Sequence, residues 1–184
     1  MKRCNIIAFG NDHTNTLGVV QSIGRTGRKC HAVMWGPKKG VVKCSRYIGR
    51  CIYSASPLSA IKLIETEFKP DNEIPTIIIG CCDDAALCLD NYKNKLNELG
   101  FLFQQSYGEM QMSDLQNKHI QTQIAQNVGF NVPYSVTIEK LEDIPDDLTF
   151  PVITKPLLSS MGKKSDIKIV RDRISLDKIV QEIL

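Results

Sequence analysis

The segment Pro75–Gly80 constrains the fold more than any other part of the chain, because it holds three consecutive isoleucines and no charged residue. A strand with one face in water alternates apolar and polar residues, whereas a strand covered on both faces is apolar almost throughout. We therefore expect this segment to be a central strand of a sheet that is layered by helices.

The rest of the N-terminal region alternates expected strands with expected helices. Further strands are expected at Asn5–Gly10, Cys30–Trp35, Phe101–Phe103 and, more weakly marked, Tyr47–Tyr53. Helices are expected from the Gly10–Thr16 turn to Gly27, from Ser56-Pro57 to Lys69-Pro70, and from Asp83 to Tyr92. This alternation predicts an α/β fold with an open parallel sheet, whose ligands lie at the carboxyl ends of the strands.

The pattern changes near Met112, where a second domain is expected to begin. A capping box at Ser113–Gln116 opens a predicted helix that ends at Gly129, and Tyr134–Ile138 is expected to be a strand. An acidic connection, Glu139–Asp147, follows. A last helix is expected to be capped by Ser175.

The stretch Phe150–Val170 is the strongest candidate for chemistry. It predicts a strand that delivers Lys155, a loop rich in small residues and lysines, and a returning strand at Ile167–Val170. Backbone N–H groups and cations in such a loop can enclose a polyphosphate. The simpler alternative is a hairpin loop with solvated charges.

Two landmarks in this order resemble the ATP-grasp superfamily. One is Asn117-Lys118 in a helix followed by Gly129-Phe130-Asn131-Val132-Pro133, and the other is Pro151-Val152-Ile153-Thr154-Lys155-Pro156 with the loop up to Gly162. The resemblance covers essentially the whole chain. It implies that residues 1–112 form a Rossmann-like pre-ATP-grasp domain and that residues 113–184 form the first, small α+β lobe of the grasp.

The resemblance also implies the ligand and the residues that hold it. ATP would be bound by Lys118 and Lys155 together with the loop residues Ser159, Ser160, Gly162 and Lys163. The reaction would transfer the γ-phosphoryl group to a carboxylate substrate and then let an amine attack the acyl phosphate. Fixed cations stabilise the negative charge that spreads over the phosphate oxygens in that step.

The sequence departs from the family pattern at several places. Asn117 stands where the family usually has aspartate, and the loop has a single glycine, Gly162. The second lobe, which would bring the acidic Mg²⁺ ligands, is not in the sequence, so we expect the N-terminal portion of a ligase that is inactive alone. Leu17–Arg25 and Asp83-Asp84 are closest in character to D-aspartate ligases and carbamoyl-phosphate-synthase-like enzymes.

The turn after the first expected strand is a second candidate site. Gly10, Asn11 and His13 precede a helix N-terminus, a common place to hold a substrate anion, although an ordinary capped turn explains them as well. Asp83 is included as a candidate substrate contact, and its alternative role is to offset the dipole at a helix start. The rival function is a non-catalytic α/β module that binds a partner or a small metabolite, with Lys118 and Lys155 as surface charges.

Composition excludes several classes of function. The net charge is only +3, and we expect the basic residues to be scattered among acids, which gives no case for nucleic acid. The longest apolar run, Ile74–Cys82, is too short to cross a bilayer, so a cytoplasmic protein is expected.

The seven cysteines and three histidines lack metal-ligand spacing, so no metal site is predicted and free thiols are expected. The oligomeric state is left open, a homo-oligomer included.

Overall fold

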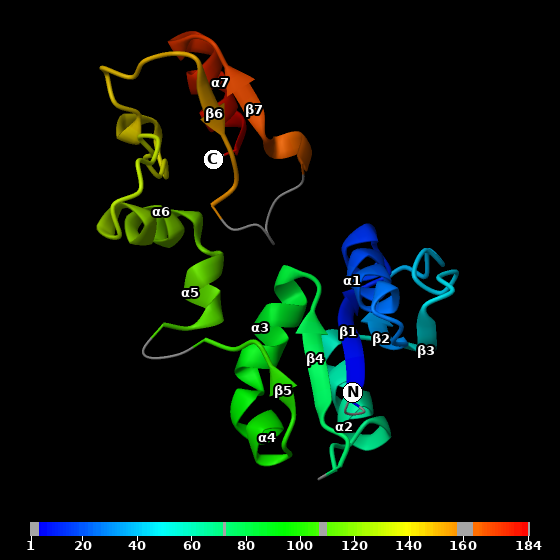
Figure 1. The fold of residues 1–184 in the computed structure, drawn as a ribbon. Helices are drawn as coiled ribbons and strands as arrows, with labels where there is room; N and C mark the ends of the chain where they lie inside the picture. The colour runs from blue at the N-terminus through cyan, green and yellow to red at the C-terminus, as the bar shows by residue number, and fades with distance from the viewer. Residues whose placement is uncertain (1–3, 72, 107–109, 158–163, 184) are drawn as a thin grey trace. The chain divides into compact units, whose positions relative to one another are not determined.

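The computed structural model describes residues 4–71, 73–106, 110–157 and 164–183. The chain forms two compact units, Met1–Met112 (unit 1) and Ser113–Leu184 (unit 2), which are described separately. Figure 1 shows the elements of each unit. Among the helices of the described residues, none combines the length and the apolar character that crossing a bilayer requires.

Unit 1 is built on a five-stranded parallel sheet, which confirms the predicted α/β class. Its strand order is β3-β2-β1-β4-β5. The strands are β1 (Asn5–Asn11), β2 (Cys30–Trp35), β3 (Ile48–Ser54), β4 (Thr76–Gly80) and β5 (Leu102–Phe103). The helices are α1 (Thr14–Arg25), α2 (Pro57–Glu67), α3 (Asp83–Asn91) and α4 (Lys93–Glu98).

The apolar strand β4 lies next to β1 near the middle of the sheet. Ile7 and Ile78 are directly paired, and both are buried. Side chains alternate between the two faces of a strand, so each face carries its own core. In one core, Ile7, Phe9 and Ile78 of the sheet pack with residues of α2 and α3. In the other core, Ile6 and Ala8 of β1 pack with Val20, which belongs to α1.

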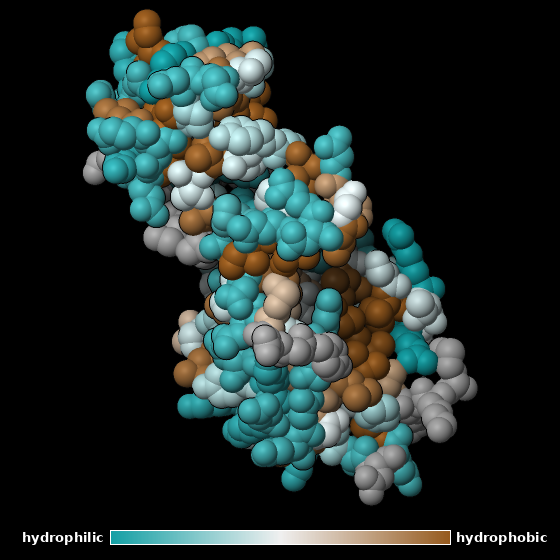
Figure 2. All heavy atoms as spheres, turned by 90° about the vertical axis from the view of Figure 1, so that its left-hand side faces the viewer, coloured by the Kyte–Doolittle hydropathy of each residue, from teal (hydrophilic) through white to brown (hydrophobic). Residues whose placement is uncertain are grey.

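On the α1 side of the sheet, apolar side chains of β4 and β5 reach the surface. Ile77 is paired with Leu102, and the Leu102 side chain is 53% exposed. Figure 2 shows where such apolar groups emerge among hydrophilic side chains. Packing over this part of the sheet is therefore less complete than over β1 and β2, where α1 lies.

The start of α2 follows the cap that the sequence predicts. Ser56 caps α2 by accepting a hydrogen bond from the backbone N–H of Ser59, and Pro57 takes the first helical position. Asp83 and Asp84 lie in the first turn of α3, where carboxylates offset the helix dipole. His13 is the N-cap of α1.

Tyr47 packs directly against α1 at Gly24. A Cβ atom added at Gly24 would lie 2.1 Å from Cγ of Tyr47, so glycine is the only residue that leaves room for the ring. The backbone carbonyl of Tyr47 also accepts a hydrogen bond from the N–H of Cys30, at the start of β2. This contact fixes the residues before β3 onto the helix.

Asp90 of α3 binds the segment that follows β5 at the end of unit 1. Its buried carboxylate accepts hydrogen bonds from the hydroxyl and N–H of Ser106, from the N–H of Met112 at 3.0 Å, and from the ammonium of Lys93. Burial alone would raise the pKa of Asp90, but these hydrogen bonds outweigh it and lower the pKa to about 2. The segment after β5 is therefore held to α3 by one charged group.

Unit 2 has a small core around a two-stranded antiparallel sheet. Its elements are α5 (Met112–Gln116, which begins at the unit boundary), α6 (Lys118–Asn127), η1 (Leu141–Asp143), β6 (Val152–Thr154), η3 (Lys164–Asp166), β7 (Lys168–Val170) and α7 (Arg173–Ile183). Ile144, Val170, Leu176 and Val180 form the buried cluster.

Three local predictions for unit 2 are wrong. The helix predicted from Ser113 is broken at Asn117, which caps α6 by accepting from the N–H groups of His119 and Ile120. Tyr134–Ile138 has no strand pairing in the described structure. Asp172, and not Ser175, accepts the hydrogen bonds at the start of α7, because its carboxylate receives both the N–H and the hydroxyl of Ser175.

The Gly24 contact predicts opposite effects for two substitutions in α1. Gly24→Ala should lower the free energy of unfolding by about 1–3 kcal/mol, because the new methyl group overlaps the Tyr47 ring. Gly18→Ala should raise it by about 0.5–1 kcal/mol, because Gly18 is an exposed helical position with open space around its Cβ direction. Urea unfolding measures both, and equal effects would contradict the packing.

The Asp90 network predicts a pH-dependent contribution to stability. Asp90→Asn should cost about 1–3 kcal/mol near pH 7, because it removes the charged acceptor of a buried network. The folded pKa of Asp90 lies below its ordinary value of 3.8, so the contribution is complete above that value and is lost as the pH falls toward about 2. Urea midpoints of wild type and Asp90→Asn should therefore converge in acid, and exposed Asp147→Asn should change little.

Candidate functional site

Lys118 is placed by the start of α6. Asn117 caps the helix, so Lys118 occupies its first position. Its ammonium group donates to the carbonyl of Leu157 at 3.5 Å, and its backbone N–H lies 3.4 Å from the same oxygen. The lysine of the first landmark therefore meets the segment that follows β6.

Lys155 belongs to that same segment. It is exposed, follows β6 directly, and stands two residues before Leu157. Two residues of extended chain span at most about 7 Å. The structure thus brings the two predicted ATP-binding lysines to one part of unit 2.

One face of the β6–β7 hairpin is apolar and exposed. Ile153 of β6 and Ile169 of β7 are directly paired, and they are 64% and 66% exposed. Val152 and Val170, on the opposite face, pack in the core. Lys155 directly follows β6 and is exposed, as Ile153 is, so an apolar pair and a lysine are both accessible in this part of unit 2.

The loop residues Ser159, Ser160, Gly162 and Lys163 lie outside the described residues. Their predicted role in holding phosphates therefore stays a prediction. The described part of the second landmark consists of β6, Lys155, Pro156 and Leu157.

In unit 1, the predicted substrate residues lie at the carboxyl ends of two adjacent strands. Gly10 and Asn11 end β1, and Asp83 begins α3 after β4. A Cβ atom at Gly10 would lie 2.9 Å from Cβ of Cys81, so glycine permits the close approach of the two strand ends. The chain turns in opposite directions from β1 and β4, which is the kind of crevice where open α/β sheets bind ligands.

Asn11 and His13 differ in how they are engaged. Oδ1 of Asn11 is buried and has no hydrogen-bond partner among the described residues, an arrangement that a bound donor group would relieve. The His13 ring is exposed; its Nδ1 lies 3.1 Å from Oγ1 of Thr14 and accepts from the N–H of Asn15 at 3.5 Å. His13 therefore has a capping role that the turn alone explains.

Asp12 was not among the residues predicted from the sequence, yet it organises this edge. Its buried carboxylate accepts hydrogen bonds from the N–H groups of Gly40 (2.6 Å) and Val42 (3.0 Å) and from the hydroxyl of Tyr53. Burial acts to raise the pKa of Asp12, but these hydrogen bonds prevail and lower it. Its only sequence signal was its place between Asn11 and His13.

The described residues do not provide a metal site. Among them, no group of three or more His, Cys, Asp or Glu side chains is arranged to hold an ion. Mg²⁺ prefers carboxylate oxygens in an octahedral set, so the residues of the described structure do not fit it.

Two surface hollows lie apart from the predicted residues. One, of about 510 Å³, is in unit 2 and is lined by residues 168–172, Ser175 and Ile179. The other, of about 480 Å³, is in unit 1 and is lined by Gln21, Arg25, Cys44, Ser45, Arg46 and Tyr47. Neither lining includes Lys118, Lys155 or the predicted substrate residues.

Comparison with known proteins finds likeness in structure. No protein-family model matches the chain. No curated protein matches it in sequence. Among solved structures, the L-amino acid ligase from Bacillus licheniformis matches 100% of the chain at 19% identity, with a TM-score of 0.61.

Two other solved structures match in the same way. The N5-carboxyaminoimidazole synthetase from Staphylococcus aureus matches 98% of the chain at 15% identity and a TM-score of 0.66. The N5-carboxyaminoimidazole ribonucleotide synthetase from Thermotoga maritima matches 97% at 15% identity and a TM-score of 0.60. The chain spans 43–45% of the length of these three structures. The predicted resemblance is thereby confirmed at the level of structure: the chain has the fold of the N-terminal portion of an ATP-grasp ligase.

Proposed function

We propose that the chain supplies the N-terminal portion of an ATP-dependent carboxylate-amine ligase. The observation that carries this proposal is the contact between the Lys118 ammonium group and the Leu157 carbonyl, next to Lys155. Two lysines separated by 37 positions in the sequence thus reach one segment of unit 2. The likeness to ligase structures supports the same interpretation.

The proposed reaction has two steps. A carboxylate oxygen of the substrate attacks the γ-phosphorus of ATP, which releases ADP and forms an acyl phosphate. An amine then attacks the acyl carbon, and phosphate leaves. The Lys118 and Lys155 ammonium groups would stabilise the charge that spreads over the phosphate oxygens, which is the main contribution a protein makes to phosphoryl transfer.

The apolar face of the hairpin suits the base of the nucleotide. Ile153 and Ile169 form an exposed pair in the part of unit 2 where Lys155 is also accessible. A planar purine ring covering this pair would remove apolar surface from water, at about 25 cal/mol per Å². The phosphates would then extend toward the lysines.

The carboxylate substrate would bind at the carboxyl edge of the sheet in unit 1. The N–H groups at the start of α1 favour an anion, and Oδ1 of Asn11 could accept from a donor group of the same substrate. Gly10, His13 and Asp83 border this edge. The identity of the substrate stays open, as does the finer kinship to D-aspartate ligases or carbamoyl-phosphate-synthase-like enzymes.

Mg²⁺ is part of the proposal only as an ion whose ligands come from a second lobe. The described residues do not fit it, so no step above uses it. The rival function, a non-catalytic α/β module, treats both lysines as solvated surface charges, so it predicts that neither contributes to nucleotide affinity.

Replacing the lysines separates the two functions. Lys155→Ala and Lys118→Ala should each weaken ATP binding roughly 10- to 100-fold. This range corresponds to the loss of one hydrogen bond to a charged group, which contributes about 1.5–3 kcal/mol. The dissociation constant should be measured by calorimetry on the protein as its gene encodes it. Lys178→Ala, an exposed lysine on α7 in the same unit, is the matched control. Unchanged ATP affinity in both lysine variants would favour the non-catalytic module.

The chain of 184 residues should show no ATP hydrolysis and no ligation by itself. The reason is that the described residues offer no acidic cluster to hold the metal that phosphoryl transfer requires. A sensitive measure is release of phosphate from ATP with Mg²⁺ present, with and without candidate carboxylates and amines. Turnover that survives in the chain but is lost in Lys155→Ala would contradict the need for a second lobe.

A further inference from the structure

Residues 13–64 contain no aspartate or glutamate. They carry nine basic residues, whereas the rest of the chain carries 14 basic and all 20 acidic residues. The prediction that basic residues are scattered among acids is therefore wrong for this part of unit 1. The nine are Arg25, Arg28, Lys29, Lys38, Lys39, Lys43, Arg46, Arg50 and Lys62.

Two of these residues face one hollow. Arg25, in the last turn of α1, and Arg46, just before β3, both line the hollow of about 480 Å³. Gln21, Ser45 and Tyr47 add an amide, a hydroxyl and an aromatic ring to its wall. We call it the arginine hollow.

Other basic residues of this stretch have charged or sulfur partners, whereas this pair has no ion pair among the described residues. Arg50 forms an ion pair with Glu67 at 2.6 Å, and Arg28 donates to the sulfur of Cys4. The positive charge of Arg25 interacts favourably with the negative C-terminal end of the α1 dipole. Among the described residues, however, neither Arg25 nor Arg46 forms an ion pair with an acidic side chain. Arg25 and Arg46 thus line one hollow, and neither has an ion-pair partner among the described residues.

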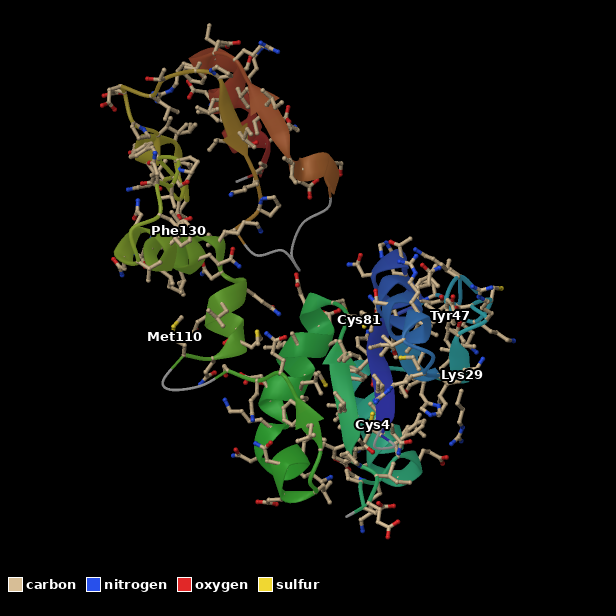
Figure 3. The ribbon with its side chains drawn as sticks, viewed as in Figure 1. Cys4, Lys29, Tyr47, Cys81, Met110 and Phe130 are labelled. Atoms are coloured by element: carbon tan, nitrogen blue, oxygen red, sulfur yellow. The ribbon has the colours of Figure 1, made fainter. Side chains whose placement is uncertain are left out.

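Contacts within the chain position the wall of the hollow. The Arg46 guanidinium donates to the Tyr47 hydroxyl at 2.7 Å and lies over the Tyr47 ring, 4.8 Å from its centre. The ring in turn sits on Gly24 of α1. Lys29 donates to the Arg46 carbonyl at 2.6 Å, and Figure 3 shows Lys29 and Tyr47 on the same side of unit 1. A guanidinium held in place loses little freedom when it binds.

The arginine hollow is distinct from the predicted substrate edge. Helix α1 begins at Thr14, beside the carboxyl end of β1, and Arg25 lies eleven residues further along it. At 1.5 Å per residue, the two ends of the helix are about 17 Å apart. A ligand in the hollow would therefore not contact the residues at Gly10–His13.

We propose that the arginine hollow binds a small molecule through a phosphate or pyrophosphate group. Arginine forks match phosphate oxygens in pairs, and such charge-assisted hydrogen bonds are stronger than neutral ones. The hollow is an open depression on the surface, so a ligand would be held there mainly through its charged group. Lys29, which donates to the Arg46 carbonyl, adds a further positive charge beside the hollow.

Inorganic pyrophosphate is the probe for this proposal. Titrated into the 184-residue chain at low ionic strength, it should bind with a dissociation constant below about 1 mM. Arg25→Gln and Arg46→Gln should each weaken binding about tenfold or more, since each removes charged hydrogen bonds. Arg50→Gln is the matched control, because it removes the same charge from a nearby ion-paired residue outside the hollow.

A variant in unit 2 distinguishes the arginine hollow from the proposed nucleotide site. Lys155→Ala should leave pyrophosphate affinity of the hollow unchanged, because Lys155 is not among the residues that line it. Loss of binding in Lys155→Ala instead would assign the probe to the nucleotide site and overturn the proposal.

The folding of the arginine variants is checked separately. Circular dichroism and thermal unfolding should show that both variants remain folded. If one of them unfolds, the wild-type chain is used instead, and pyrophosphate should change the chemical shifts of the Gly24 and Tyr47 amides, which border the hollow. The absence of such changes counts against the hollow.

Three results would contradict the proposal. The first is no pyrophosphate binding at about 10 mM, ten times the expected upper limit of the dissociation constant. The second is an equal loss in Arg50→Gln, which would show that only diffuse charge acts. The third is tight binding of a single-stranded RNA that weakens steeply with added salt and is not displaced by pyrophosphate. This result would indicate an extended surface that binds polyanions.

Discussion

The pairing of β1 with β4 is the interaction on which the rest of unit 1 depends. It buries Ile7 against Ile78 at the centre of the sheet, and parallel pairing in register carries both strands to the same carboxyl edge. Gly10 allows the two strand ends to approach, because any side chain there would meet Cys81. The starts of α1 and α3, and with them every predicted substrate residue of this unit, follow from that geometry.

Helix α1 joins two regions of different chemistry. Its N-terminal end, with its backbone N–H groups, faces the carboxyl edge of the sheet, while its C-terminal end presents Arg25 to the arginine hollow. Gly24 has no side chain, so the Tyr47 ring can pack directly against α1. The Arg46 guanidinium group lies over that ring. Packing of the Tyr47 ring against α1 thus positions one of the two arginines of the proposed site.

Much of the fold could be predicted from the sequence, because strong local signals agreed with the packing. The isoleucines of β4 and the Ser56-Pro57 start are examples. The failures share a cause: competing local signals that only tertiary contacts decide. Asn117 outcompetes Ser113 as a helix cap, and the apolar alternation of Tyr134–Ile138 has no strand beside it among the described residues. Asp12 was missed because burial of a carboxylate leaves no mark in a sequence.

The two lysines were predicted from motifs, and the geometry adds a physical reason for their pairing. The Lys118 ammonium group reaches the Leu157 carbonyl at 3.5 Å, which is long for a hydrogen bond to a neutral acceptor. In the proposed function, a phosphate oxygen would replace this carbonyl and offer a shorter, charge-assisted hydrogen bond. A lysine pointing into bulk water would gain less, because water already solvates it. The contact with Leu157 therefore places the Lys118 ammonium group beside the segment that carries Lys155, which is what the proposed binding of one ATP molecule by both lysines requires.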